Sequence, residues 1–444
     1  MRMTGTAHAR SKRGTRVGVL GAGYVGLTTA VCLAETEHDT VCVDVDADKV
    51  QRLSRGATLL DEPGLPFLLV RGLRSKDLRF TSDYAQLADR DVVFVCVPTP
   101  SADDGSTDLS AVDAAVDGLA AVLRAGSVIA VKSTVPVGTT RRLAERLRGT
   151  GISVVANPEF LREGHATYDF RHPDRIIVGS DDDGAAATVA ELCGSARALT
   201  LRMSPESAEL AKYASNAFLA VKISYANSLA RLCAQVGAHV DDVTRCMGAD
   251  VRIGGHFLSP GPGWGGSCLP KDTASLLHSA RLNGVELPEV AAARATNATQ
   301  AGRLAETLGR VMRIPLRAAR VTALGLTFKA GTNDVRDSPA LTVCAELARR
   351  GAQIAGYDPR LASIDPNPLR SSQIVPVDDP YLATKGADAI VVLTEWLLFR
   401  DLDWQAIAEQ APGAVVLDTR NVLDRSVLDD AGLRCVGNGS PGGF

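Results

Sequence analysis

The sequence predicts an α/β protein in which two domains, each a doubly wound parallel sheet, are joined by a long central helix and a helical middle domain. Two observations predict this class. Short apolar strands alternate with helical stretches in two separate blocks of the chain, and a long helical pattern without strands separates the blocks. The chain has 444 residues, enough for two or three domains of ordinary size.

The first block is assigned to a domain over residues 15–200. It opens with a strand that starts at Arg16 and runs into glycines, followed by an Ala/Leu-rich helical stretch through Ala34. Short runs of mostly apolar, β-branched residues are typical of buried parallel strands. They are expected at residues 40–44, 91–97, 127–132 and 152–156, with helical stretches between them.

The strands become sparse after residues 180–184, and a long helix is expected from Ser204 to about Val236. Serine is a good N-cap, and proline followed by glutamate is favourable in a first helical turn. The length of this helix indicates a connection between domains, within a helical middle domain over residues 201–305.

The second block predicts another α/β domain over residues 306–436. Its strands are expected at residues 319–325, 353–358, 387–393 and 414–418. The polar N-terminal residues 1–14 are expected to form a flexible extension, and the Pro/Gly-rich residues 437–444 a mobile tail.

Composition and charge exclude several classes of function. Lys plus Arg number 48 and Asp plus Glu number 51, so the net charge is -3 and nucleic acid is not an expected partner. No stretch approaches the roughly 18 to 20 apolar residues that span a membrane. The start of the chain lacks the apolar middle of a signal peptide, so a cytoplasmic protein is expected. The nine cysteines and seven histidines show no paired spacing, which predicts neither a disulfide framework nor a metal site.

A glycine-rich turn indicates a dinucleotide site. Gly21, Gly23 and Gly26 form the pattern G-x-G-x-x-G between a strand and a helix, with Tyr24 and Val25 inside it. Such a turn lets the backbone approach a pyrophosphate held at a helix N-terminus, as in Rossmann-like domains. The alternative is a glycine-rich turn that binds no ligand.

An acidic residue in the right place favours NAD as the cofactor. Asp44 ends the next strand, about 20 residues after the glycines, where a carboxylate would bind an adenosine ribose hydroxyl and repel a 2′-phosphate. Lys49, one turn later, either helps to hold the ribose or is simply exposed.

One cysteine differs from the other eight. Cys268 lies in the glycine-rich segment 257–272, just before Pro270 and a new helix. A helix N-terminus and the nearby Lys271 both favour the thiolate over the thiol. Beside a nicotinamide, a thiolate could trap an aldehyde covalently, so that a second hydride leaves from a thiohemiacetal. Taken alone, the cysteine could also be structural.

Three polar residues could complete this chemistry. Asp272 lies four residues after Cys268, so it could act as a base through water, or serve as a first-turn acid that interacts with the helix dipole. Lys212 and Asn216 are spaced i, i+4 on the long helix and could stabilise an oxyanion from one face. The alternative for this pair is a solvated stripe together with Glu209.

Polar loops also follow several strands of the first block. Glu159 and Glu163 lie in the segment 157–164, beside the expected carboxyl end of the sheet, and could activate water or bind a ligand. Thr99 and Thr134 follow other strands at the edge where cofactors bind. All four could equally belong to ordinary polar loops.

Taken together, these motifs resemble the UDP-glucose/GDP-mannose dehydrogenase family from about Arg16 to Leu433. The resemblance rests on five segments: residues 21–26, 157–164, 265–272, 325–339 and 394–396. It implies that the C6 hydroxymethyl of a nucleotide-linked hexose is oxidised to a carboxylate, with two NAD reduced per sugar.

The resemblance implies a role for each of six catalytic residues. Cys268 would form the thiohemiacetal and thioester, Lys212 and Asn216 would steady the oxyanion, Asp272 with water and Thr134 would handle protons, and Glu159 would assist thioester hydrolysis. The residues implied for the cofactor, besides Gly21, Gly23, Tyr24, Val25 and Gly26, are Asp44, Lys49, Thr99, Thr134, Glu163, Lys271 and Arg336.

The resemblance also implies a nucleotide-sugar site in the second α/β domain and its neighbours. The implied residues are Glu159, Phe160, Leu161, Arg162, Glu163, Lys212, Asn216, Phe257, Leu258, Ser259, Pro260, Gly261, Gly265 and Lys329, with Arg252 reaching in from a second subunit. Cationic Lys329 and Arg252 suit a diphosphate, although each taken singly could be a solvated surface residue. A homodimer is thereby implied, and higher assemblies would look the same.

The pattern around the cysteine favours the UDP-glucose or GDP-mannose branches of the family, and segments 252–254 and 324–329 look more like the UDP-glucose branch. UDP-glucuronate is therefore the expected product, and TDP-glucose or GDP-mannose are the alternative substrates. Trp264 stands where phenylalanine or tyrosine is usual, and Leu269 where phenylalanine is common, which bears on the substrate alone.

Two further hypotheses come from other classes. An NAD-binding regulator without turnover would have lost at least one catalytic group, and all of them are present. A relative that oxidises a small hydroxyacid or phosphosugar once would need neither the cysteine nor the second α/β domain.

Overall fold

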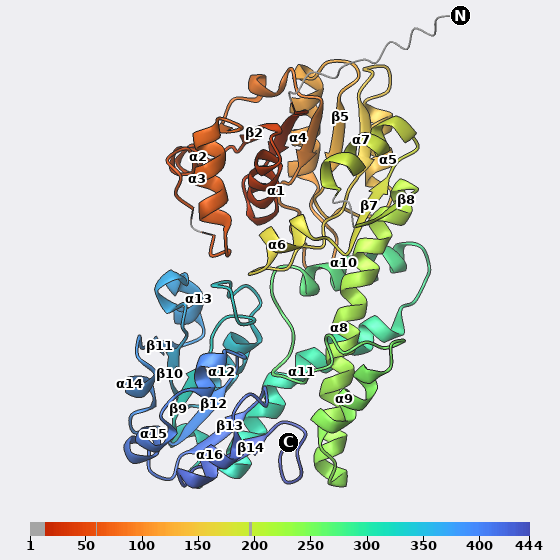
Figure 1. Cartoon of the computed structure of the whole chain (residues 1–444). Helices are drawn as coiled ribbons and strands as arrows, with labels where there is room; N and C mark the ends of the chain where they lie inside the picture. The colour runs from red at the N-terminus through yellow and green to blue at the C-terminus, as the bar shows by residue number, and fades with distance from the viewer. Residues whose placement is uncertain (1–13, 59, 195–197) are drawn as a thin grey trace, which may run out of the picture. The chain divides into compact units, whose positions relative to one another are not determined.

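The computed structural model describes residues 14–58, 60–194 and 198–444 (Figure 1). The chain divides into two compact units. Unit 1 comprises the residues up to Ala102 and Thr107–Lys212, and unit 2 comprises Asp103–Ser106 and Tyr213–Phe444. The expected flexible extension lies outside the described residues, apart from Gly14.

Unit 1 is built on a sheet that has eight strands within the described residues, in the order β3-β2-β1-β4-β5-β6-β7-β8. Neighbouring strands are parallel except for β6 and β7, which pair antiparallel at Ala156 and Gly179. The strands are β1 (Arg16–Leu20), β2 (Asp39–Val43), β3 (Leu78–Thr81), β4 (Val92–Val95), β5 (Val128–Val131), β6 (Ser153–Ala156), β7 (Arg175–Gly179) and β8 (Leu199–Met203).

Three of these strands were not expected from the sequence. Strand β8 is an edge strand whose residues are mostly exposed, and β3 at the other edge is only partly buried, so neither shows a continuous apolar pattern. Strand β7 is buried and apolar like the expected strands. The expected domain end at residue 200 falls inside β8, and unit 1 continues to Lys212.

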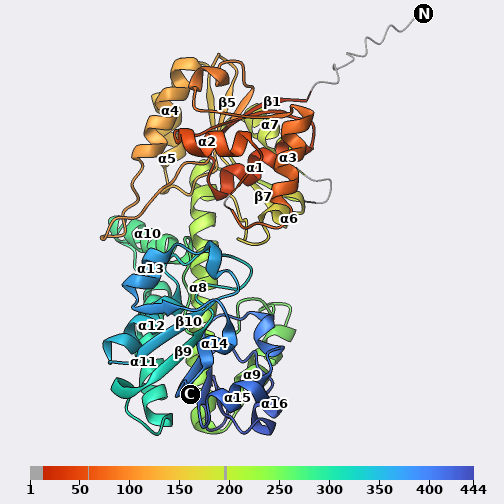
Figure 2. The same cartoon turned by 90° about the vertical axis from the view of Figure 1, so that its left-hand side faces the viewer.

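Helices cover both faces of this sheet because alternate strand residues point to opposite sides. In β4, Phe94 packs with the cluster that includes residues of α1 and α3, whereas Val93 and Val95 pack with residues of α4 and α5. Figure 2 shows α1 and α3 on one side of the strands and α4 and α5 on the other. The helices of unit 1 are α1 (Tyr24–Glu35), α2 (Ala47–Ser54), α3 (Leu65–Ser75), α4 (Ser110–Val122), α5 (Thr139–Arg146), α6 (Ala166–Arg171) and α7 (Asp183–Cys193).

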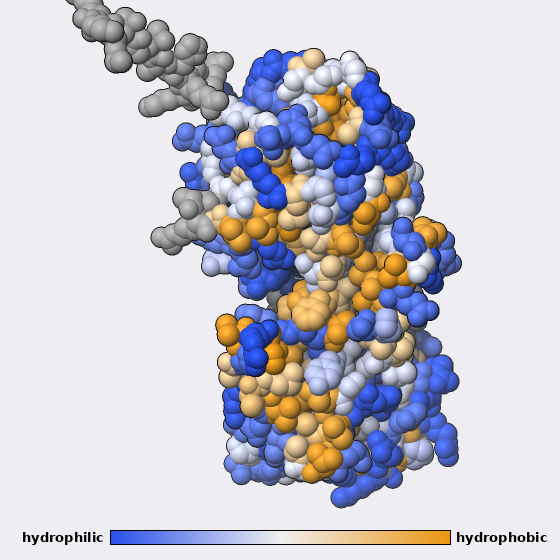
Figure 3. Space-filling view, turned by 90° about the vertical axis from the view of Figure 1, so that its right-hand side faces the viewer, coloured by the Kyte–Doolittle hydropathy of each residue, from blue (hydrophilic) through white to orange (hydrophobic). Residues whose placement is uncertain are grey.

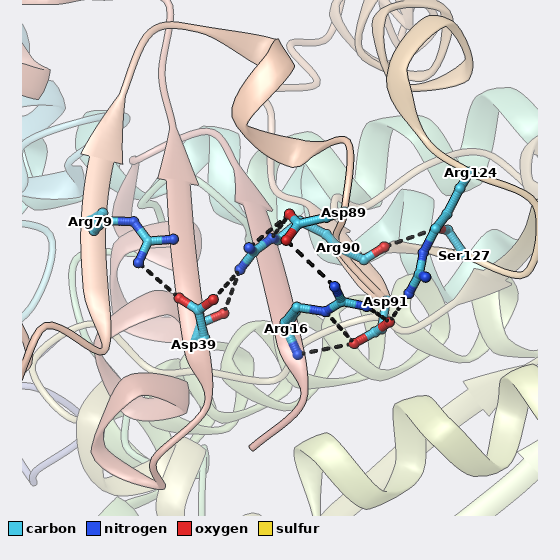
Figure 4. A network of polar contacts seen from close by, with 8 residues as sticks. All are labelled: Arg16, Asp39, Arg79, Asp89, Arg90, Asp91, Arg124 and Ser127. Atoms are coloured by element: carbon cyan, nitrogen blue, oxygen red, sulfur yellow. Dashed lines mark hydrogen bonds and ion pairs between the residues drawn. The ribbon is translucent and has the colours of Figure 1, made fainter. Parts of the chain in front are cut away.

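The amino ends of these strands carry a network of ion pairs (Figure 4). The Arg90 side chain is only 4% exposed and pairs with Asp39 at 2.9 Å and Asp89 at 2.7 Å. Arg16, the first residue of β1, binds Asp91 just before β4 at 2.9 Å. Because cofactors bind at the carboxyl ends of such strands, this network belongs to the opposite edge of the sheet.

Unit 2 contains a parallel sheet with the order β11-β10-β9-β12-β13-β14. The four expected strands are present, and the short edge strands β11 and β14 complete it. The bounds are β9 (Arg320–Leu324), β10 (Gln353–Tyr357), β11 (Ile374–Pro376), β12 (Ala389–Val392), β13 (Val415–Asp418) and β14 (Arg434–Gly437). Its accompanying helices are α12 (Pro339–Arg349), α13 (Pro366–Ser371), α14 (Pro380–Thr384), α15 (Trp404–Gln410) and α16 (Arg425–Asp430).

The long helix α8 spans Pro205–Val236, as expected, and crosses from unit 1 into unit 2 after Lys212. It ends before Gly237, whose φ of +78° is a left-handed conformation common at helix ends. Tyr213 and Ala217 of α8 pack with Leu276 and Val290 of two further helices. These two helices are α10 (Leu269–Leu282) and α11 (Pro288–Val311). Together with α9 (Val240–Ala249) and the second sheet, they belong to unit 2.

The C-terminal segment differs from the expected mobile tail. Val240 N–H donates to the Gly439 carbonyl at 2.8 Å, and the Gly439 N–H donates to the Phe444 carbonyl at 2.8 Å. Asn438 is buried, and a side chain at Gly439 would collide with Val240. The segment is therefore held by backbone hydrogen bonds and packing that its composition does not reveal. None of the described helices has the length and apolar character needed to cross a membrane.

Candidate active site

The glycine turn of unit 1 has the geometry of a dinucleotide site. Gly21 has a φ of +94°, and a Cβ there would lie 2.7 Å from the Cys96 carbonyl oxygen. A Cβ at Gly26 would lie 1.8 Å from the Gly21 carbonyl oxygen, so close packing of α1 requires glycine. A Cβ at Gly23, by contrast, would meet nothing within 4 Å. Gly21 and Gly26 thus shape the turn, and Gly23 leaves open space before the uncapped N-terminus of α1.

Asp44 lies directly beyond β2 and faces this turn. Its carboxylate accepts hydrogen bonds from Ala22 N–H at 2.7 Å and Asp46 N–H at 3.0 Å, and Lys49 Nζ lies 3.1 Å away. Burial alone would raise the pKa of Asp44, but these hydrogen bonds outweigh it and hold the pKa below its usual value. An ionised carboxylate at the carboxyl end of β2 is the group that a ribose hydroxyl needs.

Lys212 and Glu159 form a buried ion pair in unit 1. The Lys212 ammonium donates to Glu159 Oε1 at 3.0 Å and to the Glu159 carbonyl oxygen at 2.6 Å. It also lies 5.1 Å from the centre of the Phe160 ring. The structure therefore brings the expected lysine of α8 to the loop after β6, and both charges are shielded from water.

Thr134 follows β5 and lines a small cavity with Lys212 and Glu209. Glu209 was expected only in the alternative in which α8 carries a solvated polar stripe. In the structure it is buried, with an exposed fraction of 3%. It accepts hydrogen bonds from Gly138 N–H at 2.6 Å and Thr140 N–H at 2.7 Å, which caps α5. Burial raises the pKa of Glu209, partly offset by these hydrogen bonds. Glu209 thereby fixes α8 to unit 1 one turn before Lys212.

Glu62 is a buried residue that the sequence did not single out. It accepts hydrogen bonds from the Tyr24 hydroxyl at 2.9 Å and from Gly164 N–H at 2.8 Å. Tyr24 also donates to the Arg162 carbonyl at 2.7 Å, and burial raises its pKa. The glycine turn and the expected Glu159–Glu163 segment are therefore joined through one acid. Residues 61–64 read Asp-Glu-Pro-Gly, which looks like an ordinary turn.

The other expected cofactor and substrate residues of unit 1 differ in their exposure. Thr99 is buried after β4, and Glu163 and Leu161 are partly buried. Arg162 is exposed and pairs with Asp169 at 2.6 Å.

Four expected catalytic and cofactor residues meet in unit 2. Cys268 is exposed and is the N-cap residue of α10, with its sulfur 3.5 Å from the Ser267 hydroxyl. Asp272, fully buried, accepts a hydrogen bond from Asn216 Nδ2 at 2.6 Å and pairs with Lys271 Nζ at 2.6 Å. Both carboxylate oxygens of Asp272 thus face donors, one of them charged.

Helix α11 holds the start of α10 through a residue that the sequence did not reveal. Arg294 donates to the Pro270 carbonyl at 2.8 Å and to the Thr273 hydroxyl at 2.7 Å. Burial lowers the pKa of Arg294. Its guanidinium therefore supports the turn on which Cys268 stands.

The expected substrate loop, residues 257–265, is fixed by α8 and α11. Gly261 N–H donates to Asn227 Oδ1 at 2.7 Å, and Gln300 Nε2 donates to the Gly261 carbonyl at 3.2 Å. A Cβ at Gly265 would lie 1.8 Å from the Asp337 carbonyl oxygen, so the loop packs directly on the segment before α12. Phe257 is exposed with a φ of +63°, Leu258 and Pro260 are buried, and Ser259 is exposed.

Three expected cationic residues lie on the surface of unit 2. Arg252 is exposed and pairs with Asp250 at 2.5 Å. Arg336 pairs with Asp334 at 2.6 Å, and Lys329 lies 5.8 Å from the Phe328 ring centre. Arg420 was not expected, yet a Cβ at Gly261 would lie 2.6 Å from its guanidinium, so it borders the substrate loop. Within the described residues no cluster of side chains suits a metal ion.

Three family models match successive parts of the chain. They are the NAD binding domain (residues 15–196), the central domain (206–299) and the UDP binding domain (322–425) of the UDP-glucose/GDP-mannose dehydrogenase family.

Individual relatives match over nearly the whole chain. The UDP-glucose 6-dehydrogenase of Pseudomonas aeruginosa is 41% identical over 442 residues, covering 96% of this chain and 98% of the relative. That of Rhizobium meliloti is 41% identical over 439 residues, covering 96% and 100%.

Solved structures share the fold. A UDP-glucose dehydrogenase from Pyrobaculum islandicum superposes with a TM-score of 0.85 at 37% identity, covering 93% of this chain and 96% of that one. A UDP-D-ManNAc dehydrogenase from Pyrococcus horikoshii gives 0.86 at 28% identity, covering 96% and 100%. With three matching family domains and full-length relatives at this identity, the chain belongs to the UDP-glucose/GDP-mannose dehydrogenase family.

Proposed function

We propose that this chain oxidises the C6 hydroxymethyl of UDP-glucose to the carboxylate of UDP-glucuronate. The observation that carries the proposal is the cluster in unit 2, where an exposed cysteine begins α10 and the buried Asp272 is held by Asn216 and Lys271. UDP-glucose is preferred because two UDP-glucose 6-dehydrogenases match over nearly the whole chain.

The carboxyl end of the first sheet fits NAD. The open space at Gly23 allows a pyrophosphate to approach the α1 N-terminus, and Asp44 can accept a hydrogen bond from the ribose. Thr99, Thr134, Glu163, Lys271 and Arg336 are the further residues that we assign to this site. When bound there, NAD would supply the hydride acceptor for each of the two oxidations, so two NADH are expected per sugar.

Cys268 provides the covalent step. After the first oxidation its sulfur adds to the C6 carbonyl carbon and the oxygen takes a proton, which gives a thiohemiacetal. Loss of a second hydride and of that proton leaves a thioester. Water then breaks the carbon–sulfur bond, so that the carboxylate leaves and the thiolate returns. The balance is four electrons and one water per sugar.

We assign the handling of charge and protons to five further polar residues. We assign the oxyanion at C6 to Lys212 and Asn216, which lie one turn apart on α8. Asp272 takes protons from the hydroxyl and from water, with Thr134 assisting. Glu159, which holds Lys212 in place, assists hydrolysis of the thioester.

The nucleotide sugar is assigned to the loops rich in backbone donors and cations. These are residues 159–163, the loop 257–265, Lys329 and the partner's exposed Arg252, in a homodimer. The free cysteines and the nucleotide-sugar substrate both favour a cytoplasmic location.

The α8 surface supports the dimer. Phe218, Tyr225 and Leu232 are spaced seven residues apart on one face of α8 and are 54–63% exposed. Figure 3 shows the side of the molecule on which α8 and α9 lie in Figure 1, and apolar residues gather there. A second copy of the chain would bury this stripe.

The test is to count NADH formed per sugar consumed, with UDP-glucose, TDP-glucose and GDP-mannose offered separately under excess NAD. Two NADH per UDP-glucose are expected. With Cys268→Ser, the thioester cannot form, so carboxylate production should fall by about 10³-fold or more.

Different outcomes overturn different parts of the proposal. If two NADH form with GDP-mannose and none with the other sugars, the proposed four-electron oxidation stands, but UDP-glucose is not the substrate. One NADH per sugar, or full turnover in Cys268→Ser, would reject the covalent mechanism. Cys246→Ser is the matched control, because Cys246 is also exposed and lies outside the cluster.

A further inference from the structure

Unit 2 contains a cavity of about 310 Å³ between α8 and α11 that the proposed reaction does not use. Residues 438, 443 and 444 of the C-terminal segment complete its wall. Three residues of α8, spaced four apart and therefore on one helix face, line the cavity: Asn227, Arg231 and Gln235. Counted at 100° per residue, Asn227 lies about 160° from Tyr225 of the exposed Phe218–Leu232 stripe, whereas Gln235 lies about 60° from Leu232. The size suits a small metabolite.

The lining carries more cationic than anionic side chains, and of these Arg310 and Glu306 are exposed to solvent. Arg231, Arg303 and Arg310 bring three guanidinium groups to the walls, whereas Glu306 is the single acidic side chain among the lining residues. Within the part of the chain that the structure describes, no carboxylate lies at ion-pair distance from any of the three arginines. Glu306 itself lies 3.7 Å from Arg350. The cavity therefore holds an excess of cationic groups in a protein of net charge -3.

Two buried donors at the cavity have no partner among the described residues. They are Nδ2 of Asn227, in a side chain that is 2% exposed, and Nε of Arg231. Buried donors in native proteins are nearly always paired, and each exception calls for an acceptor that supplies the missing bond. The remaining contacts are short-range, since Arg231 donates to Ser228 and Arg310 to Thr307, both at 3.1 Å.

We propose that this cavity binds a phosphate-bearing metabolite. Phosphate oxygens accept several hydrogen bonds at once, and guanidinium forks match their geometry and charge. One carboxylate cannot satisfy three guanidinium groups, whereas a phosphate dianion or a diphosphate matches their excess positive charge.

The same residues connect the cavity to the substrate loop. Asn227, which lines the cavity, accepts the Gly261 N–H through its side-chain oxygen. Gln300, also in the lining, donates to the Gly261 carbonyl. An occupant that orders Asn227 thus orders the loop 257–265. This second part rests on the proposed function, and it makes the cavity a regulatory site for nucleotide-sugar binding.

Binding is tested by calorimetry with inorganic phosphate, pyrophosphate and glucose 1-phosphate as separate probes. The wild-type chain is expected to bind at least one of them, and the three probes distinguish a free phosphate from a diphosphate and a sugar phosphate. Arg303→Gln/Arg310→Gln should weaken that binding at least about tenfold, since two charged hydrogen-bond donors are lost. Arg313→Gln is the matched control, because Arg313 is exposed and does not line the cavity.

Each other result overturns the proposal. No binding of any probe would leave a cavity filled by water. Binding that survives Arg303→Gln/Arg310→Gln would belong to another site, such as that of the nucleotide sugar. An equal loss in Arg313→Gln would indicate diffuse charge attraction.

The regulatory part has its own readout. The saturating probe should change the KM for UDP-glucose in the wild-type chain and leave it unchanged in Arg303→Gln/Arg310→Gln. Binding without a change in KM would overturn the coupling alone. Binding in a chain that turns over no sugar would overturn the proposed function and leave the anion site standing.

Discussion

Asp272 shows how single residues define the chemistry of unit 2. It is fully buried, and a buried carboxylate is costly unless it is paired. Lys271 and Asn216 supply that pairing from the neighbouring residue and from α8. The expectation that Lys271 favours the thiolate of Cys268 is modified by this arrangement, because the ammonium is committed to Asp272. The N-terminus of α10 remains beside the sulfur.

Asp44 allows a prediction with a defined pH dependence. Hydrogen bonds from Ala22 and Asp46 and the ion pair with Lys49 hold its folded pKa below the unfolded value of about 4. For an acid with a lowered pKa, the stabilisation is present above the unfolded pKa and is lost as the pH falls through the folded pKa. Asp44→Asn should therefore lower the free energy of unfolding by about 1 kcal/mol at pH 7, with the gap closing as the pH falls below the unfolded pKa of about 4 and through the lowered folded pKa.

Denaturant unfolding at several pH values measures this gap. Asp48→Asn is the control, since Asp48 is an exposed acid of α2 and should show little effect. A gap that persists unchanged at low pH would show that the ionised carboxylate is not its cause.

At the scale of elements, the second sheet repeats the turn of the first. Gly21 has a φ of +94° and donates to the Val43 carbonyl, and Gly325 has a φ of +89° and donates to the Tyr357 carbonyl. In both turns an aspartate just beyond the next strand accepts the N–H after the glycine. Asp358, however, also accepts from Thr327 and Trp396, so its carboxylate is enclosed by the protein. The same turn thus serves a different purpose in unit 2.

The glycine turn gives a paired prediction. In Gly26→Ala the new methyl would lie within 1.8 Å of a backbone oxygen, so unit 1 should lose about 2 kcal/mol or more of stability. In Gly23→Ala the methyl meets only open space, so stability should change by less than about 1 kcal/mol. That methyl nevertheless occupies the path of the pyrophosphate, and the affinity for NAD should fall at least about tenfold.

Thermal unfolding and a titration with NAD separate the two effects. A Gly23→Ala chain that binds NAD normally would contradict the assignment of this turn, whatever the behaviour of Gly26→Ala.

The sequence predicted the buried elements better than the edges. Central strands such as β4 are continuous apolar runs, whereas the edge strands β3, β8 and β11 lack a strong pattern because one side meets water. Motif residues at the glycine turn and around Cys268 could be predicted because their spacing is fixed by local geometry. Glu62, Glu209 and Arg294 were missed because each acts through a long-range hydrogen bond to another segment.

At the scale of the whole molecule, the proposed dimer depends on the exposed apolar stripe of α8. Phe218 is 63% exposed, Tyr225 54% and Leu232 56%, and Val236 one turn later is 66% exposed. Burial of four large apolar side chains is favourable by about 1.5–3 kcal/mol each at full burial. Arg252 and the adjacent Val251, which is 95% exposed, are likewise available to a partner.

A charge in this stripe should dissociate the dimer. Tyr225→Asp/Leu232→Asp would place two carboxylates in an apolar interface, where their desolvation is not compensated. Light scattering after size exclusion should then give the mass of one chain, against twice that mass for the wild type.

Leu282→Asp, at the exposed end of α10, is the control that should stay dimeric. Because the partner's Arg252 is assigned to the diphosphate, the dissociated variant should also show a KM for UDP-glucose raised about tenfold or more. A wild-type chain that is monomeric, or a monomeric variant with an unchanged KM, would show that the partner's Arg252 does not contribute to substrate binding.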